Sequence, residues 1–302
     1  MRGSLPRAWL FVPGDSERKQ TRALASGADA LILDLEDSVA PGQRDTARAR
    51  CAGLLGSSRA GPQLWVRVNP PGSDELAADL EALGAQALPH GVVLPKVSAP
   101  TELVALSDRL SGLEARRGQP QGAVRVLVIA TETAAAVLNL PQYLPTLAAA
   151  PATLARLLGL TWGMEDLGAV LGASRRRAAD GSLAPTFQLA RSTCLLTAAA
   201  LGVAAVDGVY TDYRDGAGLE QELRDSRADG FTGKLAIHPS QIGPIQDAFT
   251  PTDAECERAR RVLAAFAAAG GAGVTSLEGE MLDRPHLLQA QRTLARAGKA
   301  SP

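Results

Sequence analysis

The stretch ALILDLED, residues 30–37, indicates the fold class of this chain. A strand that is buried on both faces reads as a continuous apolar run, whereas a half-exposed strand alternates between apolar and polar residues. Here the apolar run passes into three carboxylates, Asp34, Glu36 and Asp37, at its carboxyl end. Parallel barrels carry their chemistry at that end of their strands. The stretch therefore predicts one strand of a parallel sheet with a functional rim.

Similar apolar runs recur along the chain, and segments of helical character lie between them. We expect strands at residues 8–12, 30–35, 64–68, 91–94, 124–129, 157–161, 206–210 and 234–237, and helices that include residues 16–26, 44–55, 74–83, 101–117 and 184–201. Eight strands alternating with helices predict an α/β fold, a closed TIM (β/α)8 barrel over residues 1–245. A doubly wound open sheet is the main alternative. The first strand is followed by PGDSE, however, and not by the G-x-G-x-x-G turn of dinucleotide-binding folds.

Residues 246–302 are expected to form a C-terminal helical extension. An alanine-rich helix is predicted at 252–269, a short extended run at 274–277, and a final helix at about 285–297 after the sequence GEMLDRP at 279–285. An appendage of this length beyond a complete barrel must pack on its own barrel or on a neighbour. We favour a neighbouring subunit.

Composition excludes several classes of function. With 46% hydrophobic and 21% charged residues in 302, the chain is typical of soluble globular proteins. Its 31 basic and 32 acidic residues nearly cancel, so we expect no binding to nucleic acid or to an anionic membrane, and an anionic ligand must be held by a local cluster. There is no apolar stretch of the kind a membrane span or a secretory leader requires. Cys51, Cys194 and Cys256 lack C-x-x-C spacing, which fits a reduced cytoplasm better than a zinc knuckle or a disulfide framework.

Two carboxylates point to a metal site. Glu132 follows the fifth apolar run and Asp166 the sixth, so in a barrel they converge at the rim. Two hard carboxylates without histidine or thiolate suit Mg²⁺, or Mn²⁺, completed by water and substrate oxygens. The alternative is that each carboxylate caps the helix that follows it, where negative charge is favourable.

Further charged residues belong to the same rim. Burial and mutual repulsion raise the pKa of clustered acids, so Asp34, Glu36 and Asp37 must lie beside a cation or in water. We expect them to accept hydrogen bonds from metal-bound water. The alternative is that Asp37 and Ser38 merely begin a turn. Arg67 ends the third strand, where its guanidinium could clamp a substrate carboxylate. A structural ion pair with the acids of the second strand is the alternative.

The remaining candidates are weaker by pattern alone. Arg18 and Arg22 stand four residues apart on one helix face and could hold phosphate, although spacing alone favours solvated surface. His238 ends the eighth strand, where we favour a structural role before Pro239 over acid–base or metal chemistry. Serine hydrolysis and nucleotide hydrolysis lack their motifs, G-x-S-x-G and the P-loop.

Nine motifs follow one another along nearly the whole chain: RAWLFVPG from 7, DLEDSV from 34, RVN from 67, LPKV from 94, ETA from 132, GMEDL from 163, YTDYRDGAGL from 210, GFTGKLAIHPSQI from 230 and GEMLDRP from 279. This series resembles the citrate lyase beta subunit-like proteins of the HpcH/HpaI aldolase superfamily. The likeness is greatest to the branch of citramalyl-CoA and malyl-CoA lyases, whose C-terminal segment carries a G-x-M-I/V-D pattern.

The resemblance implies a TIM barrel with Mg²⁺ on Glu132 and Asp166, and Arg67 on the carboxylate of a keto acid. It also implies homotrimers or hexamers in which the C-terminal segment covers a neighbour's barrel mouth. Asp283 would then be the catalytic acid–base residue that reaches across the interface.

The resemblance also assigns the coenzyme A part of the substrate. Phe11, Arg18 and Arg22 match positions that hold it, which gives the arginine pair a function that spacing alone does not. Arginine replaces lysine at both phosphate positions, and the charge is kept.

The activity implied is Mg²⁺-dependent cleavage, or formation, of a β-hydroxyacyl thioester such as citryl-, malyl- or citramalyl-CoA. The products are an acyl thioester and oxaloacetate, glyoxylate or pyruvate. One alternative is the beta subunit of a citrate lyase complex acting on an acyl-carrier-protein thioester. Others are a non-catalytic oxaloacetate-binding or structural subunit, and a thioesterase activity after condensation.

Overall fold

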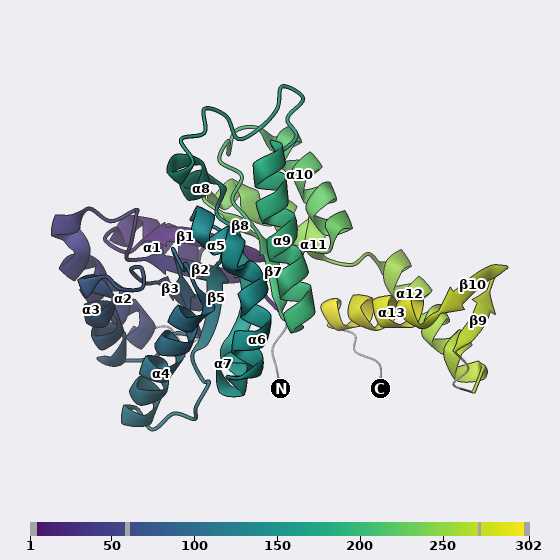
Figure 1. Ribbon diagram of the computed structural model, residues 1–302, viewed down its shortest axis with the longest axis horizontal. Coiled ribbons are helices and arrows are strands. Elements are labelled where there is room, and N and C mark those ends of the chain that lie inside the picture. Colours follow the sequence, from purple (N-terminus) through teal and green to yellow (C-terminus); the bar gives the residue numbers. More distant parts are fainter. Residues whose placement is uncertain (1–4, 58–60, 271–272, 299–302) are drawn as a thin grey trace. The chain divides into compact units, whose positions relative to one another are not determined.

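The computed structural model describes residues 5–57, 61–270 and 273–298. The start of the expected barrel domain, residues 1–4, and the end of the expected C-terminal extension, residues 299–302, lie outside the described residues. Eight parallel strands close into a barrel in chain order (Figure 1). Its strands are β1 Ala8–Pro13, β2 Ala30–Asp34, β3 Gln63–Arg67, β4 Gly91–Leu94, β5 Arg125–Ile129, β6 Leu157–Thr161, β7 Ala204–Asp207 and β8 Gly233–Ala236. The predicted TIM barrel is confirmed. The open sheet is wrong, because β1 pairs with both β2 and β8.

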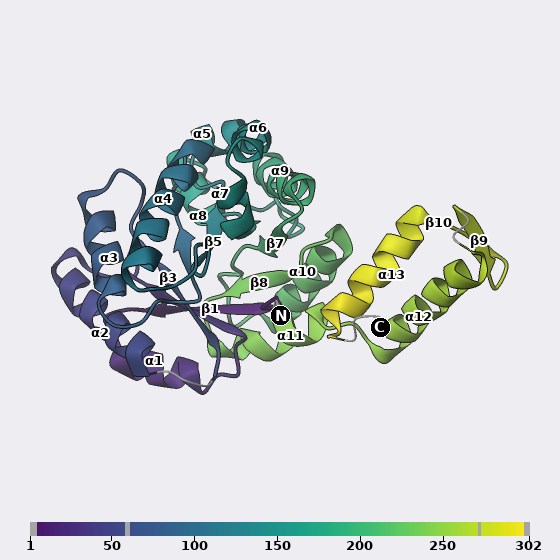
Figure 2. The ribbon, with the colours of Figure 1, turned by 90° about the horizontal axis from the view of Figure 1, so that it is seen from below.

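Helices ring these strands (Figure 2). They are α1 Glu17–Leu24, α2 Arg44–Ser57, α3 Asp74–Gly84, α4 Pro100–Arg116, α5 Ala134–Asn139, α6 Tyr143–Ala148, α7 Pro151–Arg156, α8 Met164–Val170, α9 Pro185–Leu201, α10 Gly216–Asp229 and α11 Ile242–Phe249. The connection between β5 and β6 is divided into the short helices α5 to α7. Proline interrupts a helix interior but is tolerated in its first turn, and Pro151 begins α7.

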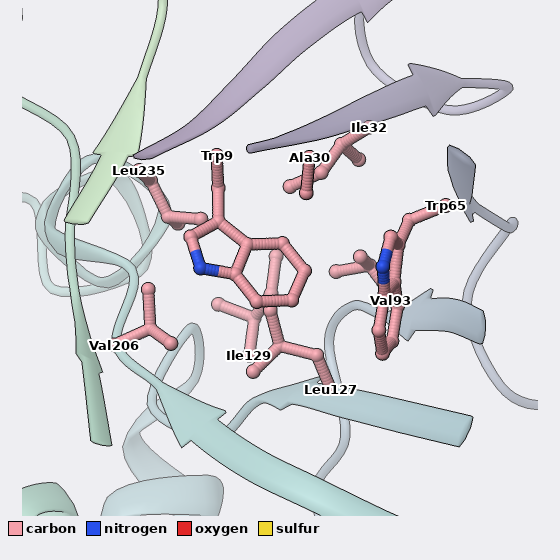
Figure 3. Packing of buried hydrophobic residues seen from close by; sticks show 9 residues of the cluster. All are labelled: Trp9, Ala30, Ile32, Trp65, Val93, Leu127, Ile129, Val206 and Leu235. Atoms are coloured by element: carbon pink, nitrogen blue, oxygen red, sulfur yellow. The ribbon is translucent and has the colours of Figure 1, made fainter. Parts of the chain in front are cut away.

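The barrel interior is filled by side chains from seven of its strands (Figure 3). The cluster comprises Trp9, Ala30, Ile32, Trp65, Val93, Leu127, Ile129, Val206 and Leu235, all at most 3% exposed. The rings of Trp9 and Trp65 meet edge to face with centroids 4.9 Å apart. Gly91 makes room for Trp65, since a Cβ at position 91 would lie 2.2 Å from the Trp65 ring. The interior is therefore a packed core, and chemistry is confined to the rim.

Strand β7 lies earlier in the chain than predicted, at Ala204–Asp207 and not 206–210. Asp207 ends the strand because its buried carboxylate accepts hydrogen bonds from Gly208 N, from Trp162 Nε1 at 2.6 Å and from Arg191 Nε at 3.1 Å. Residues 208–210 therefore leave the sheet.

Residues from Gln246 onward group into a second compact unit, distinct from the barrel unit Arg7–Ile245. It contains α12 Asp253–Ala268, β9 Val274–Leu277, β10 Glu280–Asp283 and α13 Arg284–Arg296. A core of its own includes Phe266, Leu282 and Leu294. The hairpin of β9 with β10 was not predicted: its turn uses positive φ at Glu278 and Gly279, which matches the twist of the two strands.

The described helices include none with the length and apolar character that a bilayer crossing needs.

Candidate active site

Asp34 and Arg67 form a buried pair at the carboxyl ends of β2 and β3, where they are register neighbours. Arg67 Nε donates to Asp34 Oδ1 at 2.7 Å and Nη2 donates to Oδ2 at 2.6 Å. Burial alone would raise the pKa of Asp34, but the hydrogen bonds and charge of Arg67 outweigh it and hold this pKa below its ordinary value. The ion pair that the sequence left open for Arg67 is therefore present.

Two further contacts orient the guanidinium of Arg67. Its Nη1 lies 3.0 Å from Glu36 Oε2, and its Cζ lies 4.9 Å from the centroid of the Phe11 ring. The side chain is 11% exposed. A guanidinium held on three sides is already oriented for a ligand, which lowers the entropic cost of binding.

Lys96, which follows β4, joins acids from three other strand ends. Its ammonium contacts Glu36, lies 2.9 Å from Asp37 Oδ1 and lies 3.7 Å from Asp166 Oδ1. Its backbone N–H donates to Glu132 Oε2 at 2.5 Å. Lys96 stands just after the apolar run of β4, in LPKV, and its charge at that point was the available signal, but no role was predicted for it.

Glu132 is 2% exposed and lies directly beyond β5. Burial raises its pKa to about 8; the N–H of Lys96 opposes the shift, and the negative charge of Asp166 adds to it. Among the residues that the structure describes, no lysine or arginine side chain forms an ion pair with Glu132. The absence of a side chain at Gly163 leaves the space that Glu132 occupies, since a Cβ at position 163 would lie 2.6 Å from Glu132 Cγ.

Asp166 lies in the first turn of α8, and its side chain is 33% exposed. It is close enough to Glu132 to raise that group's pKa, and both residues contact Lys96. The two carboxylates expected to bind a metal therefore lie at the same rim, each in contact with Lys96. Among the described residues no three His, Cys, Asp or Glu side chains are grouped to hold a metal, so the donors in question are this pair alone.

The charge of the rim fits a divalent cation. Five carboxylates, those of Asp34, Glu36, Asp37, Glu132 and Asp166, face two cations, Arg67 and Lys96. The donors are hard oxygens, as Mg²⁺ and Mn²⁺ prefer. A buried glutamate with a raised pKa is moreover a group that a nearby cation would return to its charged form.

A cavity of about 540 Å³ opens beside Arg67. Three cations of α1, Arg18, Lys19 and Arg22, line it. Its apolar lining includes Phe11, Val209, Ile237 and Pro239. All three residues expected to hold coenzyme A therefore line one cavity. Lys19 was missed, because the i, i+4 pattern selects the arginines and passes over the residue between them.

His238 also lines this cavity and caps the turn Pro239–Gln241. Its Nδ1 accepts from Ser240 N at 3.2 Å, and its ring stacks on Tyr213 with centroids 4.6 Å apart. These contacts fit the structural role favoured from the sequence.

Asp283 belongs to the C-terminal unit, where it caps α13. Its Oδ1 lies 2.6 Å from Nδ1 of His286, and the two side chains are 43% and 40% exposed. Its predicted acid–base role in a neighbouring subunit stays a prediction.

Comparison with known proteins gives the family. The model of the HpcH/HpaI aldolase/citrate lyase family matches residues 7–239. A citrate lyase subunit beta-like protein of Mycobacterium tuberculosis is 38% identical over 296 residues, which cover 97% of this chain and 96% of that protein. This chain belongs to the HpcH/HpaI aldolase/citrate lyase family. The resemblance seen in the motifs is confirmed, and so is the expected enzyme class, a lyase.

Other relatives differ in their activities. The mitochondrial citramalyl-CoA lyase of Rattus norvegicus is 37% identical over 298 residues, covering 96% of this chain and 86% of that protein. A (3S)-malyl-CoA thioesterase of Cereibacter sphaeroides is 36% identical over 294 residues, covering 96% of this chain and 94% of that protein. The crystal structure of CitE from M. tuberculosis in complex with magnesium, acetoacetate and coenzyme A superposes with a TM-score of 0.76 at 37% identity, covering 99% and 100% of the two chains.

Proposed function

We propose that this member of the family is a Mg²⁺-dependent carbon–carbon lyase that cleaves, or forms, a β-hydroxyacyl-CoA such as citryl-, malyl- or citramalyl-CoA. The observation that carries the proposal is that Glu132 and Asp166 both contact Lys96 at one rim of the barrel, which also holds Arg67 and a cavity with three cations. The relatives add support, since CitE is crystallised with magnesium, acetoacetate and coenzyme A. The proposed cellular location is the cytoplasm.

The cations of α1 support coenzyme A as the carrier of the acyl group. Coenzyme A carries a pyrophosphate and a 3′-phosphate. Arg18, Lys19 and Arg22 match this negative charge. The apolar lining on Val209, Ile237 and Pro239 suits the less polar parts of the same molecule.

The residues divide the reaction between them. A divalent ion on Glu132 and Asp166 would supply a Lewis acid for the hydroxyl oxygen that becomes the carbonyl oxygen of the product. Arg67, oriented by Asp34, binds the carboxylate of the keto-acid half, and Glu36 and Asp37 accept hydrogen bonds from water at the rim. As the bond between the α-carbon and the carbinol carbon breaks, its electron pair passes to the thioester as an enolate. Asp283 of a neighbouring subunit gives a proton to that α-carbon, and the hydroxyl proton leaves to water.

The test is a panel of malyl-, citramalyl- and citryl-CoA with Mg²⁺ or with a chelator. Carbon–carbon cleavage releases a keto acid and an acyl-CoA but no free thiol. We expect keto acid from at least one thioester in Mg²⁺ and none in chelator. Keto acid formed equally well in chelator, or from none of the thioesters, would contradict the proposal.

The same panel distinguishes a second candidate, a malyl-CoA thioesterase. The relationship to the Cereibacter sphaeroides enzyme favours it. Hydrolysis releases coenzyme A as a free thiol together with malate, so a thiol reagent in the assay separates the two reactions.

A further inference from the structure

Lys96 lies among the acids of the rim, and the proposed reaction gives it no task. We propose that Lys96 is a positioning residue: its ammonium gathers Glu36 and Asp37 and, by charge repulsion, weakens the affinity of the Glu132 and Asp166 pair for a divalent ion. The inference rests on the proposed function, because it assumes a metal on that pair.

The backbone conformation of Lys96 lets its N–H and its side chain contact different acids. Its φ is +52°, and among the described residues only Glu278 is another non-glycine with positive φ. A lysine in this left-handed region costs free energy that the surroundings must supply. In this conformation its N–H donates to Glu132 Oε2 while its side chain reaches the acids beyond β2.

The side chain of Lys96 joins groups that would otherwise repel one another. Glu36 is 3% exposed and Asp37 is 51% exposed, and both oxygens of Asp37 lie within 3.0 Å of the ammonium. Asp166 Oδ1 is 3.7 Å away, at the edge of ion-pair distance. The positive charge of the ammonium therefore neutralises part of the negative charge that would attract a divalent ion.

The sign of its effect on metal affinity separates two roles. If Lys96 only held the site in shape, its removal would disorder the carboxylates and weaken metal binding. If it also acts as a tethered counter-cation, its removal relieves a repulsion between like charges and increases the negative field, so the metal binds more tightly.

The experiment is calorimetric titration of the full chain with MgCl₂ alone, without substrate. For Lys96→Met we expect the Kd for Mg²⁺ to fall by about tenfold or more, and for Lys96→Arg, which keeps the charge, a Kd within about twofold of the wild type. Arg116→Met, which removes an exposed cation from the last turn of α4, is the matched control and should leave the Kd unchanged.

An unchanged or larger Kd in Lys96→Met overturns the inference. Lys96→Gln provides a second neutral variant should the first fail to fold, as judged by circular dichroism, and the same outcomes apply to it. A wild type that binds no Mg²⁺ at all would instead contradict the proposed function. Binding by the wild type that Lys96→Met does not alter would remove only the role of Lys96.

Discussion

Glu132 is a carboxylic acid that its surroundings keep protonated near neutral pH. Burial raises its pKa to about 8 in the folded chain, from 4.5 for an ordinary glutamate. Between these two values the folded state holds a proton that the unfolded state releases. The stability due to this group is therefore complete below the lower value and is lost as the pH rises through the upper one.

The first prediction follows from this loss of stability with rising pH. For metal-free protein, the free energy of unfolding should fall as pH rises through this window, and Glu132 should contribute up to about 1.4 kcal/mol per pH unit to the slope. Glu132→Gln, which does not titrate, should lack that contribution. Urea unfolding of both proteins at several pH values measures it, and parallel curves would show that Glu132 does not hold the extra proton.

Gly163 is the residue that gives Glu132 its place. A methyl group there would lie 2.6 Å from Glu132 Cγ and 3.3 Å from Ile129 Cγ2. We expect Gly163→Ala to lower the free energy of unfolding by about 1–3 kcal/mol, the usual cost of overpacking, and to weaken Mg²⁺ binding because Glu132 must move. Chemical unfolding and calorimetry measure the two effects.

Gly53 provides the control for that variant. It lies inside α2, where an added Cβ meets nothing within 4 Å, so Gly53→Ala should be neutral or stabilising. If the two alanine variants have the same free energy of unfolding and the same Mg²⁺ affinity, Gly163 is not needed to leave space for Glu132.

Most residues of the site, although not Lys19 or Lys96, could be named from the sequence, but their contacts could not. A charge at the end of a buried run identifies Arg67 and Glu132. Arg67 and Asp34, which share two hydrogen bonds, are 33 positions apart in the sequence, and Lys96 and Glu36, which are in contact, are 60 positions apart. Such pairings depend on barrel closure and register, which no local pattern encodes.

Helix α1 carries the third prediction. It presents Arg18, Lys19 and Arg22 to the cavity beside Arg67. We expect the double variant Arg18→Gln, Arg22→Gln to raise KM for coenzyme A thioesters by roughly tenfold or more, since two charge-assisted phosphate contacts are lost. The KM for the same acid as a thioester of N-acetylcysteamine, which has no phosphate, should hardly change. Steady-state kinetics with both substrates measures the difference.

The matched control removes two exposed arginines from the outer helix α4, as Arg109→Gln together with Arg116→Gln. It changes the net charge equally and should leave KM for the thioesters unaltered. Equal effects of the two double variants would indicate a general electrostatic effect and return the α1 arginines to solvated surface.

Elements were predictable where a single cause determines them. Continuous apolar runs located β4 and β6 to the residue, because both strands are covered on each face. Strand β7 was misplaced, because its end depends on the bonds of Asp207 to Trp162 and Arg191, 45 and 16 positions away. The strand β10 was missed, because its turn uses Glu-Gly where Asn-Gly is the usual signal.

At the scale of the whole molecule, the proposed reaction draws on both compact units. The barrel unit contains Glu132, Asp166 and Arg67, whereas Asp283 belongs to the C-terminal unit with its separate core. The citrate lyase subunit beta-like relative aligns along both units, so the C-terminal unit is part of what they share. A reaction divided in this way predicts that an active site can be assembled from two different chains.

Mixing two inactive variants tests that prediction. Glu132→Gln lacks a proposed metal ligand and Asp283→Asn lacks the proposed proton donor, so each alone should be inactive. If Asp283 serves a neighbouring subunit, a one-to-one mixture assembled by co-expression should regain roughly a quarter of wild-type activity, because random assortment pairs an intact Glu132 with a neighbour's intact Asp283 at that frequency. If both residues serve the site of their own chain, every site in the mixture lacks one of them and activity stays absent. Light scattering on the same sample reports whether the assembly is a trimer or a hexamer, and a monomer that nevertheless regained activity would contradict the shared site.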